Sequence, residues 1–186
     1  MPVLNLHAMH WNSRANGPGN RAVFWFQGCS LRCPGCFNPE THTHAPCLLV
    51  PVSELLVRIE QCQAALEGIT VSGGEPLEQP TELLHLLRGI RERTRLSVVL
   101  FSGLTRDRIE ALSVGPELLA AADVLIAGPF VRELGMAEGL RGSSNQEIHL
   151  LSNRYDLDRI AGTPVGEVHI DPRGIVSVTG IDPPSL

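Results

Sequence analysis

The sequence lacks any apolar run long enough to cross a membrane. Its hydrophobic stretches all fall well short of the roughly 20 residues that a spanning helix needs. The segment from Met1 to Trp11 also lacks the basic-then-apolar order of a secretion signal. We therefore expect no membrane partner and a cytoplasmic location.

Positive charge is scarce as well. The 186 residues include 15 Lys and Arg against 20 Asp and Glu, and the net charge of −5 does not favour a nucleic-acid partner. No low-complexity tract, run of like charges or internal repeat interrupts the chain. With 43% hydrophobic residues it is long enough to bury a sizeable core. We expect a single domain over residues 1–186.

Cysteine occurs at only five positions, and three of these fall within eight residues. This distribution does not resemble the disulfide framework of a secreted domain, and a reducing compartment would keep the thiolates available for other chemistry. Cys62 falls on the apolar face of a predicted helix and is interpreted as a core residue. Cys47 falls in a predicted loop, and its role stays open, as do the roles of His42 and His44.

The three clustered cysteines, Cys29, Cys33 and Cys36, have the spacing C-x-x-x-C-x-x-C after an apolar run over 23–27 that predicts a strand. Three thiols within eight residues require the chain to wrap closely around one object, and Pro34-Gly35 supplies the bends. We interpret the motif as an iron–sulfur site. A cubane cluster takes one external ligand on each of its four irons, so three thiolates leave one iron open for chemistry.

Two simpler interpretations compete with an open cluster. The cysteines can be small buried hydrophobes. Alternatively, a structural zinc ion would take the three thiolates and a fourth ligand from His42, His44 or Cys47. The zinc interpretation would make the chain a non-catalytic module that acts through binding.

A second motif, Gly73-Gly74-Glu75-Pro76, follows another predicted strand over 68–72. Two glycines let a ligand lie directly against the main chain, where backbone N–H and C=O groups can bind it. Glu75 adds an acceptor for an ammonium group. Alone, this motif would be common turn material. Its pairing with the cysteine motif, each after a strand, makes the signal specific.

Together the two motifs resemble those of the radical S-adenosylmethionine (SAM) superfamily. In that family the open iron of a [4Fe-4S] cluster is chelated by the amino and carboxylate groups of SAM. The resemblance implies that Cys29, Cys33 and Cys36 bind the cluster and take part in catalysis. It also implies that Gly73-Gly74-Glu75-Pro76 holds the methionine part of SAM. Reductive cleavage of SAM would then give a 5′-deoxyadenosyl radical that takes a hydrogen atom from the substrate.

A narrower resemblance is to the short activating enzymes of anaerobic ribonucleotide reductase. Most of the superfamily has an aromatic residue just before the third cysteine, whereas this chain has Gly35 there and Phe37 just after Cys36, as that group does. Further segments similar to that group lie at 16–19, 27–29, 123–130 and 140–146. The resemblance covers about 16–151, which implies that the core of the domain lies there. This resemblance implies that Phe37 and Asn38 line the adenine side of SAM.

The remaining apolar patterns predict alternating helices and strands. Helices are expected over 53–66, 81–93, 106–112 and 116–122, and further strands over 96–101, 123–127 and 147–151. Loops are expected over 1–20, 37–47 and 131–144. Strands over 166–170 and 175–179, on either side of Asp171-Pro172-Arg173-Gly174, predict a C-terminal hairpin within about 164–180. Strands that return in one direction imply an α/β fold with a mainly parallel sheet, and the resemblance implies a partial (β/α) barrel.

Two later segments add candidate cofactor contacts. Ser102 ends the third predicted strand, where radical SAM proteins often contact the ribose, although it would serve equally as a turn residue. Ser144 and Asn145 lie in a glycine-containing segment, 141–146, that is rich in hydrogen-bonding groups. A well-solvated loop would look similar, and the resemblance favours the cofactor contact.

The shortness of the chain bears on its substrate. Little sequence lies beyond the core, so the site should be open on one side, which suits a macromolecular substrate. We therefore expect an oxidoreductase that generates a glycyl radical on a partner enzyme, an anaerobic ribonucleotide reductase, with flavodoxin or ferredoxin as electron donor. The alternative enzyme modifies another peptide or a small molecule. The alternative of another class is a non-catalytic zinc or iron–sulfur module.

Overall fold

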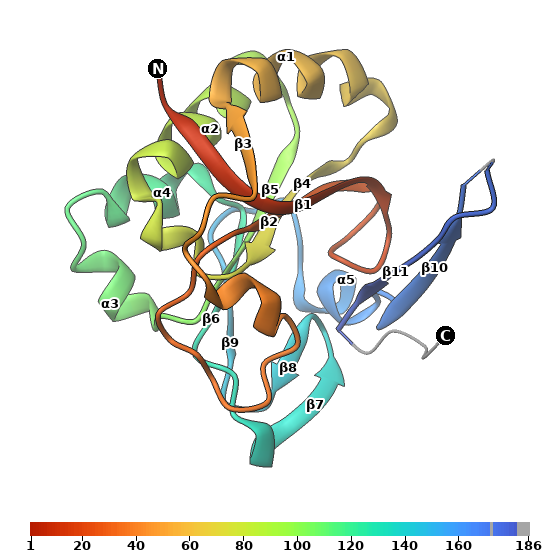
Figure 1. Ribbon diagram of the computed structural model, residues 1–186. Coiled ribbons are helices and arrows are strands. Elements are labelled where there is room, and N and C mark those ends of the chain that lie inside the picture. The colour runs from red at the N-terminus through yellow and green to blue at the C-terminus, as the bar shows by residue number, and fades with distance from the viewer. Residues whose placement is uncertain (172, 182–186) are drawn as a thin grey trace.

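A seven-stranded sheet organises the computed structural model, which describes residues 1–171 and 173–181 (Figure 1). In the order β3-β1-β2-β4-β5-β6-β9, its strands are Leu48–Pro51, Val3–Ser13, Arg21–Phe26, Gly68–Gly73, Ser97–Ser102, Val124–Ala127 and Glu147–Leu150. The middle strands β2, β4, β5 and β6 are parallel, whereas β1, β3 and β9 join antiparallel at the two sides. The expected α/β class with a parallel centre is confirmed.

Helices connect the middle strands, because parallel neighbours need a crossover. The helix α1 (Val52–Cys62) precedes β4, α2 (Pro80–Arg93) joins β4 to β5, and α3 (Arg106–Glu110) and α4 (Gly115–Ala121) join β5 to β6. The 3-10 turns η1 (Pro39–His42), η2 (Gln63–Ala65) and η3 (Pro76–Glu78) lie in the loops. Among the described residues, no helix is both long enough and apolar enough to span a membrane.

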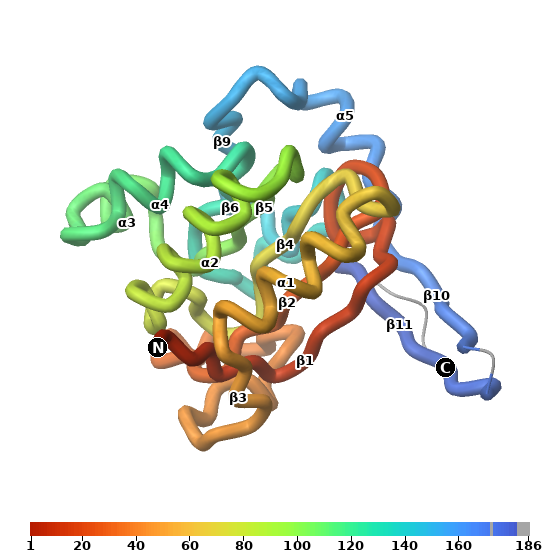
Figure 2. The backbone as a smooth tube through the Cα atoms, turned by 90° about the horizontal axis from the view of Figure 1, so that it is seen from above, coloured from red at the N-terminus to blue at the C-terminus, as the bar shows by residue number. Residues whose placement is uncertain are grey.

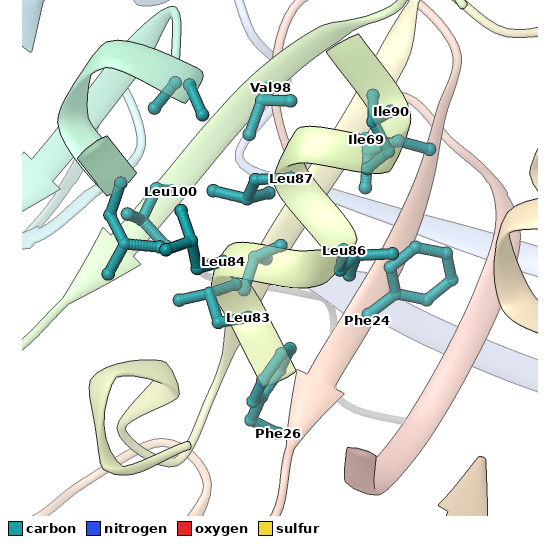
Figure 3. Close-up of a cluster of buried hydrophobic side chains, with 14 of the residues drawn as sticks. Phe24, Phe26, Ile69, Leu83, Leu84, Leu86, Leu87, Ile90, Val98 and Leu100 are labelled. Carbon is teal, nitrogen blue, oxygen red and sulfur yellow. The ribbon is translucent and has the colours of Figure 1, made fainter. Parts of the chain in front are cut away.

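The main core lies between α2 and the sheet (Figure 3). Leu83, Leu86, Leu87 and Ile90 recur at the spacing of one helical face and are fully buried. They meet side chains from three neighbouring strands: Phe24, Ile69 and Val98. α2 also packs between α1 and α4. The helix therefore holds together the strands β2, β4 and β5, whose carboxyl ends form the site described below.

The N-terminal segment, expected to be a loop over 1–20, forms β1 instead. Leu4 and Leu6 are fully buried, while polar residues such as Asn5 and His7 alternate with them. This is the period-two pattern of a half-buried strand. The prediction was wrong because the polar residues left no continuous apolar run. The short strand β3, which pairs with the start of β1, was not expected either.

Residues 131–144, also expected to be a loop, contain a turn and a small hairpin. The turn is η4 (Arg132–Leu134), and the hairpin consists of β7 (Gly135–Glu138) and β8 (Arg141–Ser143). Gly139 and Leu140 between the strands have φ values of 56° and 72°, as tight hairpin turns require. Other differences are smaller: α1 ends at Cys62 rather than 66, β9 runs antiparallel to β6, and α5 (Leu157–Ala161) is additional.

The C-terminal hairpin has the expected strands, β10 (Gly166–Ile170) and β11 (Val176–Gly180). Pro172 in its predicted turn lies outside the described residues. The hairpin is a separate two-stranded sheet beside the end of β1 (Figure 2). The Glu167 carboxylate accepts hydrogen bonds from the Arg14 N–H at 2.9 and 3.0 Å. A defined contact therefore fixes the hairpin against β1.

Candidate active site

Most of the predicted site residues line one pocket at the carboxyl ends of the parallel strands. The cysteine loop follows β2, the Gly-Gly-Glu-Pro segment follows β4, and Ser102 ends β5. The predicted residues in the pocket wall are Cys29, Cys33, Cys36, Phe37, Asn38, Gly73, Gly74, Glu75 and Ser102. The pocket has about 940 Å³ of empty space, including its open side.

Three predicted residues lie outside the pocket wall. Pro76 is buried at the start of η3. Ser144 is exposed, and Asn145 turns its side chain to the Pro129 carbonyl at 2.8 Å. The pocket is instead reached by their neighbour Gln146.

Gln146 is a pocket residue that the sequence reasoning missed. Its Oε1 accepts hydrogen bonds from the Gly142 and Ser143 N–H groups, and its Nε2 donates to the Gly128 carbonyl at 3.0 Å. Gln146 therefore joins the loop after β6 to the end of β8. The flagged segment 141–146 carried the signal, but it did not show which of its side chains turns inward.

The cysteine loop is tightly wound. The Cys36 N–H donates to the Cys33 carbonyl at 3.1 Å, with Gly35 at a φ of 74°, where a side chain would be strained. Cys29 is only 8% exposed, while Cys33 and Cys36 are half-buried. Burial raises the pKa of the Cys29 and Cys36 thiols, so binding of a metal cluster there must displace protons.

The donor set fits an iron–sulfur cluster. Three free thiols face one pocket, and thiolates are the usual cluster ligands. Within residues 1–171 and 173–181, no three His, Cys, Asp or Glu side chains are arranged to hold a single metal ion. A cluster does not need that arrangement, because each thiolate binds a different iron.

The cysteine loop has a polar anchor on η3. The Glu78 carboxylate accepts from the Ser30 N–H at 2.7 Å and lies 2.6 Å from His44 Nε2. Burial opposes ionisation of Glu78, but the bonds from His44 and Ser30 prevail and lower its pKa. His44, whose role the sequence left open, therefore braces the cysteine loop against η3.

The two glycines of the second motif bring it against the cysteine loop. The Gly74 N–H donates to the Phe26 carbonyl at 2.8 Å, and the Glu75 N–H donates to the Gly28 carbonyl at 2.9 Å. A Cβ at Gly73 would lie 2.4 Å from the Phe26 nitrogen, and one at Gly74 would lie 2.3 Å from the Gly28 oxygen. Close approach of the two backbones thus requires glycine here.

Glu75 joins the ends of β4 and β5. Its carboxylate is 2% exposed and accepts hydrogen bonds from the Leu77 N–H, the Ser102 hydroxyl and the Gly103 N–H at 2.8 to 3.1 Å. Burial outweighs these bonds and raises the pKa of Glu75 to about 7. The sequence suggested an acceptor for an ammonium group. In the structure, this carboxylate instead accepts its hydrogen bonds from groups of the protein itself.

Aromatic side chains form one wall of the pocket. The Phe37 and Phe130 rings have centroids 4.7 Å apart, and Phe37 is 54% exposed. A Cβ at Gly142 would lie 2.5 Å from Phe37 Cε2, so the glycine makes room for this ring. A half-exposed ring beside Asn38 offers a flat apolar surface and a polar group to a planar heterocycle.

Comparison with known proteins agrees with this geometry. Residues 15–149 match the family described as 4Fe-4S single cluster domain. The anaerobic ribonucleoside-triphosphate reductase-activating protein of Escherichia coli K12 is 29% identical over 155 residues, which cover 80% of this chain and 99% of that protein. Its Salmonella typhi counterpart is 30% identical over 143 residues, covering 73% and 92%. The pyruvate formate-lyase-activating enzyme of Clostridium pasteurianum is 36% identical over 97 residues, covering 50% and 41%.

The chain therefore belongs to the 4Fe-4S single cluster domain family and, within it, to the radical SAM activating enzymes of glycyl-radical enzymes. A [4Fe-4S] cluster and SAM are the cofactors of this group.

Proposed function

We propose that this protein generates a glycyl radical on an anaerobic ribonucleoside-triphosphate reductase. The observation that carries the proposal is the convergence of Cys29, Cys33 and Cys36 with Gly73-Gly74-Glu75 on one open pocket. When bound, the cluster and SAM supply reductive cleavage of SAM and abstraction of a hydrogen atom from a glycine Cα. Two relatives named as activating proteins of that reductase, which this chain matches over 99% and 92% of their length, support this choice of partner.

In this proposal the three thiolates hold the cluster and the glycine motif holds the methionine part of SAM. Phe37, Asn38 and Ser102 surround the nucleoside part, for which the aromatic wall and the polar end of β5 are suited. Gln146 is added to this set from the pocket wall, in place of Ser144 and Asn145.

The proposal also covers the fold, the electron donor and the cellular compartment. The parallel strands β2, β4, β5 and β6 would be the centre of a partial (β/α) barrel with its site at the carboxyl ends, as in other α/β enzymes. Residues 1–186 would act as one domain, with the hairpin appended to the core. Flavodoxin or ferredoxin would supply the electron, and the reducing cytoplasm would keep the thiols free.

The test uses anaerobically reconstituted protein. We expect about four irons per chain and formation of 5′-deoxyadenosine from SAM with dithionite. Cys33→Ala should lose this activity. Cys47→Ala is the matched control, because Cys47 is exposed and outside the pocket wall, and it should keep the activity. Bound zinc without SAM cleavage in the wild type would contradict the proposal.

A further inference from the structure

A second groove adjoins the pocket. Its walls are residues 7–10 of β1 and residues 177–181 at the end of β11, and its empty space is about 1050 Å³ including the open side. Trp25, Phe37 and Asn38 at its inner end also line the first pocket. A molecule lying in the groove would therefore lead into the candidate active site.

The β1 wall is an unpaired strand edge. β1 pairs with β3 only over Val3–Leu6, while its pairing with β2 continues to Ser13. From His7 onward, no strand of the described chain lies on the side away from β2. Consecutive residues form the wall, although successive side chains of a strand point to opposite faces. The wall therefore includes the edge of β1 as well as side chains on one of its faces.

The β11 wall is a second unpaired edge, because within residues 1–171 and 173–181 this strand pairs only with β10. Next to the turn, the Asp171 N–H donates to the Ile175 carbonyl at 3.0 Å. Hydrogen-bonded pairs alternate along an antiparallel ladder. The backbone groups of Val176 and Val178 therefore point away from β10, and of these two residues only Val178 lines the groove.

We propose that the groove binds, by strand addition between β1 and β11, the extended segment of the partner polypeptide that carries the radical-accepting glycine. This rests on the proposed function. Backbone edges bind an extended chain through main-chain hydrogen bonds, and the groove wall contains no Asp, Glu, Lys or Arg, so an uncharged segment fits it. The Glu167 contact with Arg14 holds the hairpin in place beforehand, which lowers the cost of binding.

Residues 7–10 and the hairpin lie outside residues 15–149, which match the family.

The experiment compares Val178→Pro with Val176→Pro in the full-length, cluster-loaded protein. Proline removes an outward N–H and blocks an added strand without removing a β10–β11 hydrogen bond. The probe is the anaerobic ribonucleoside-triphosphate reductase encoded in the same genome. Glycyl radical is measured by electron paramagnetic resonance at increasing reductase concentration. SAM cleavage is measured in parallel on the same preparations of each variant, with no reductase added.

We expect Val178→Pro to need about tenfold more reductase for half-maximal radical formation, after normalisation to its SAM cleavage. Tenfold corresponds to a loss of about 1.4 kcal/mol in binding free energy. Val176→Pro should stay within about twofold of the wild type, because its N–H lies outside the groove. If the two variants needed equal reductase concentrations, the proposed role of the groove would be overturned. If Val178→Pro lost a dimer of this chain while activation was unchanged, the groove would be a contact between two copies of the chain, and the proposal would be overturned too. Absence of SAM cleavage in the wild type would instead overturn the proposed function.

Discussion

The side chain of Glu75 connects the two halves of the candidate site. Its carboxylate reaches from the glycine motif to Ser102 and Gly103 at the end of β5. Because it is almost completely buried, its pKa lies at about 7 rather than near the usual value. The protonated and the ionised forms are therefore both accessible near neutral pH.

This pKa predicts a pH dependence of folding. The pKa of Glu75 is raised in the folded state, so its stabilising contribution is complete below the unfolded value of about 4.3 and is lost as the pH rises through about 7. We expect Glu75→Gln to remove a fall of a few kcal/mol in the unfolding free energy between these pH values. Urea titrations of the cluster-free protein at several pH values measure it. The exposed-site control Glu92→Gln should keep the fall, and an unchanged slope in Glu75→Gln would refute the assignment.

The site also shows what single residues reveal in a sequence. The three cysteines were recognisable because so few structures need three thiols in eight residues. Gln146 was not, because an amide in a polar loop gives no sign of the direction in which it points. The second task of the glycine motif, contact with the backbone of the cysteine loop, depends on a neighbour that only the fold supplies.

Among the elements, those with strong periodicity were predictable. α2 and β4 lie within a residue of their expected bounds, because their apolar residues repeat at helix and strand spacing. β1 was missed because one of its faces is polar, and β3 because it is short and gains its stability by pairing with β1. The antiparallel direction of β9 depends on chain reversals within 128–146, which no local pattern encodes.

The C-terminal hairpin should respond to acid in two steps. Burial and the neighbouring His169 lower the pKa of His10. Burial opposes ionisation of Glu167, but hydrogen bonds from Ser13, Arg14 and Thr179 lower its pKa. The stabilisation from neutral His10 is lost as the pH falls below about 6.5, and that from ionised Glu167 as it falls through its lowered pKa. Both changes weaken docking of the hairpin on β1.

The amide signal of Arg14, which donates to Glu167, reports this docking in nuclear magnetic resonance spectra between pH 7.5 and 4. We expect Glu167→Gln to abolish the more acidic step and to retain the step that belongs to His10. The Val98 amide, which donates to the buried Asp123, is the reference signal and should not follow these steps. A hairpin that titrates identically with and without Glu167 would contradict this account.

At the scale of the whole molecule, the two ends of the sheet differ. The carboxyl ends of the parallel strands hold the open pocket, whereas a buried cation closes the opposite end. The Arg21 guanidinium is fully buried and donates to Thr70 Oγ1, the Ile69 carbonyl and Ser97 Oγ at 2.7 to 3.0 Å. It joins the starts of β2, β4 and β5. Burial lowers its pKa.

Arg21→Lys should therefore lower stability without altering the chemistry. Lysine cannot reproduce the planar set of donors, and the loss should be about 2 to 4 kcal/mol in the unfolding free energy. Arg95→Lys, at an exposed site, should change it by less than about 0.5 kcal/mol. Urea denaturation measures both. SAM cleavage per cluster-loaded molecule should be retained in Arg21→Lys, and a selective loss of cleavage would show that Arg21 acts on the site.

The backbone hydrogen bonds between the two motifs have a consequence for divergence. The Gly74 and Glu75 N–H groups donate to the carbonyls of Phe26 and Gly28, so the spacing between the two motifs is set by main-chain atoms. Most side-chain substitutions leave such bonds in place. A 29% identity to the Escherichia coli relative is therefore compatible with an unchanged spacing between the two motifs, because that spacing does not depend on most of the side chains.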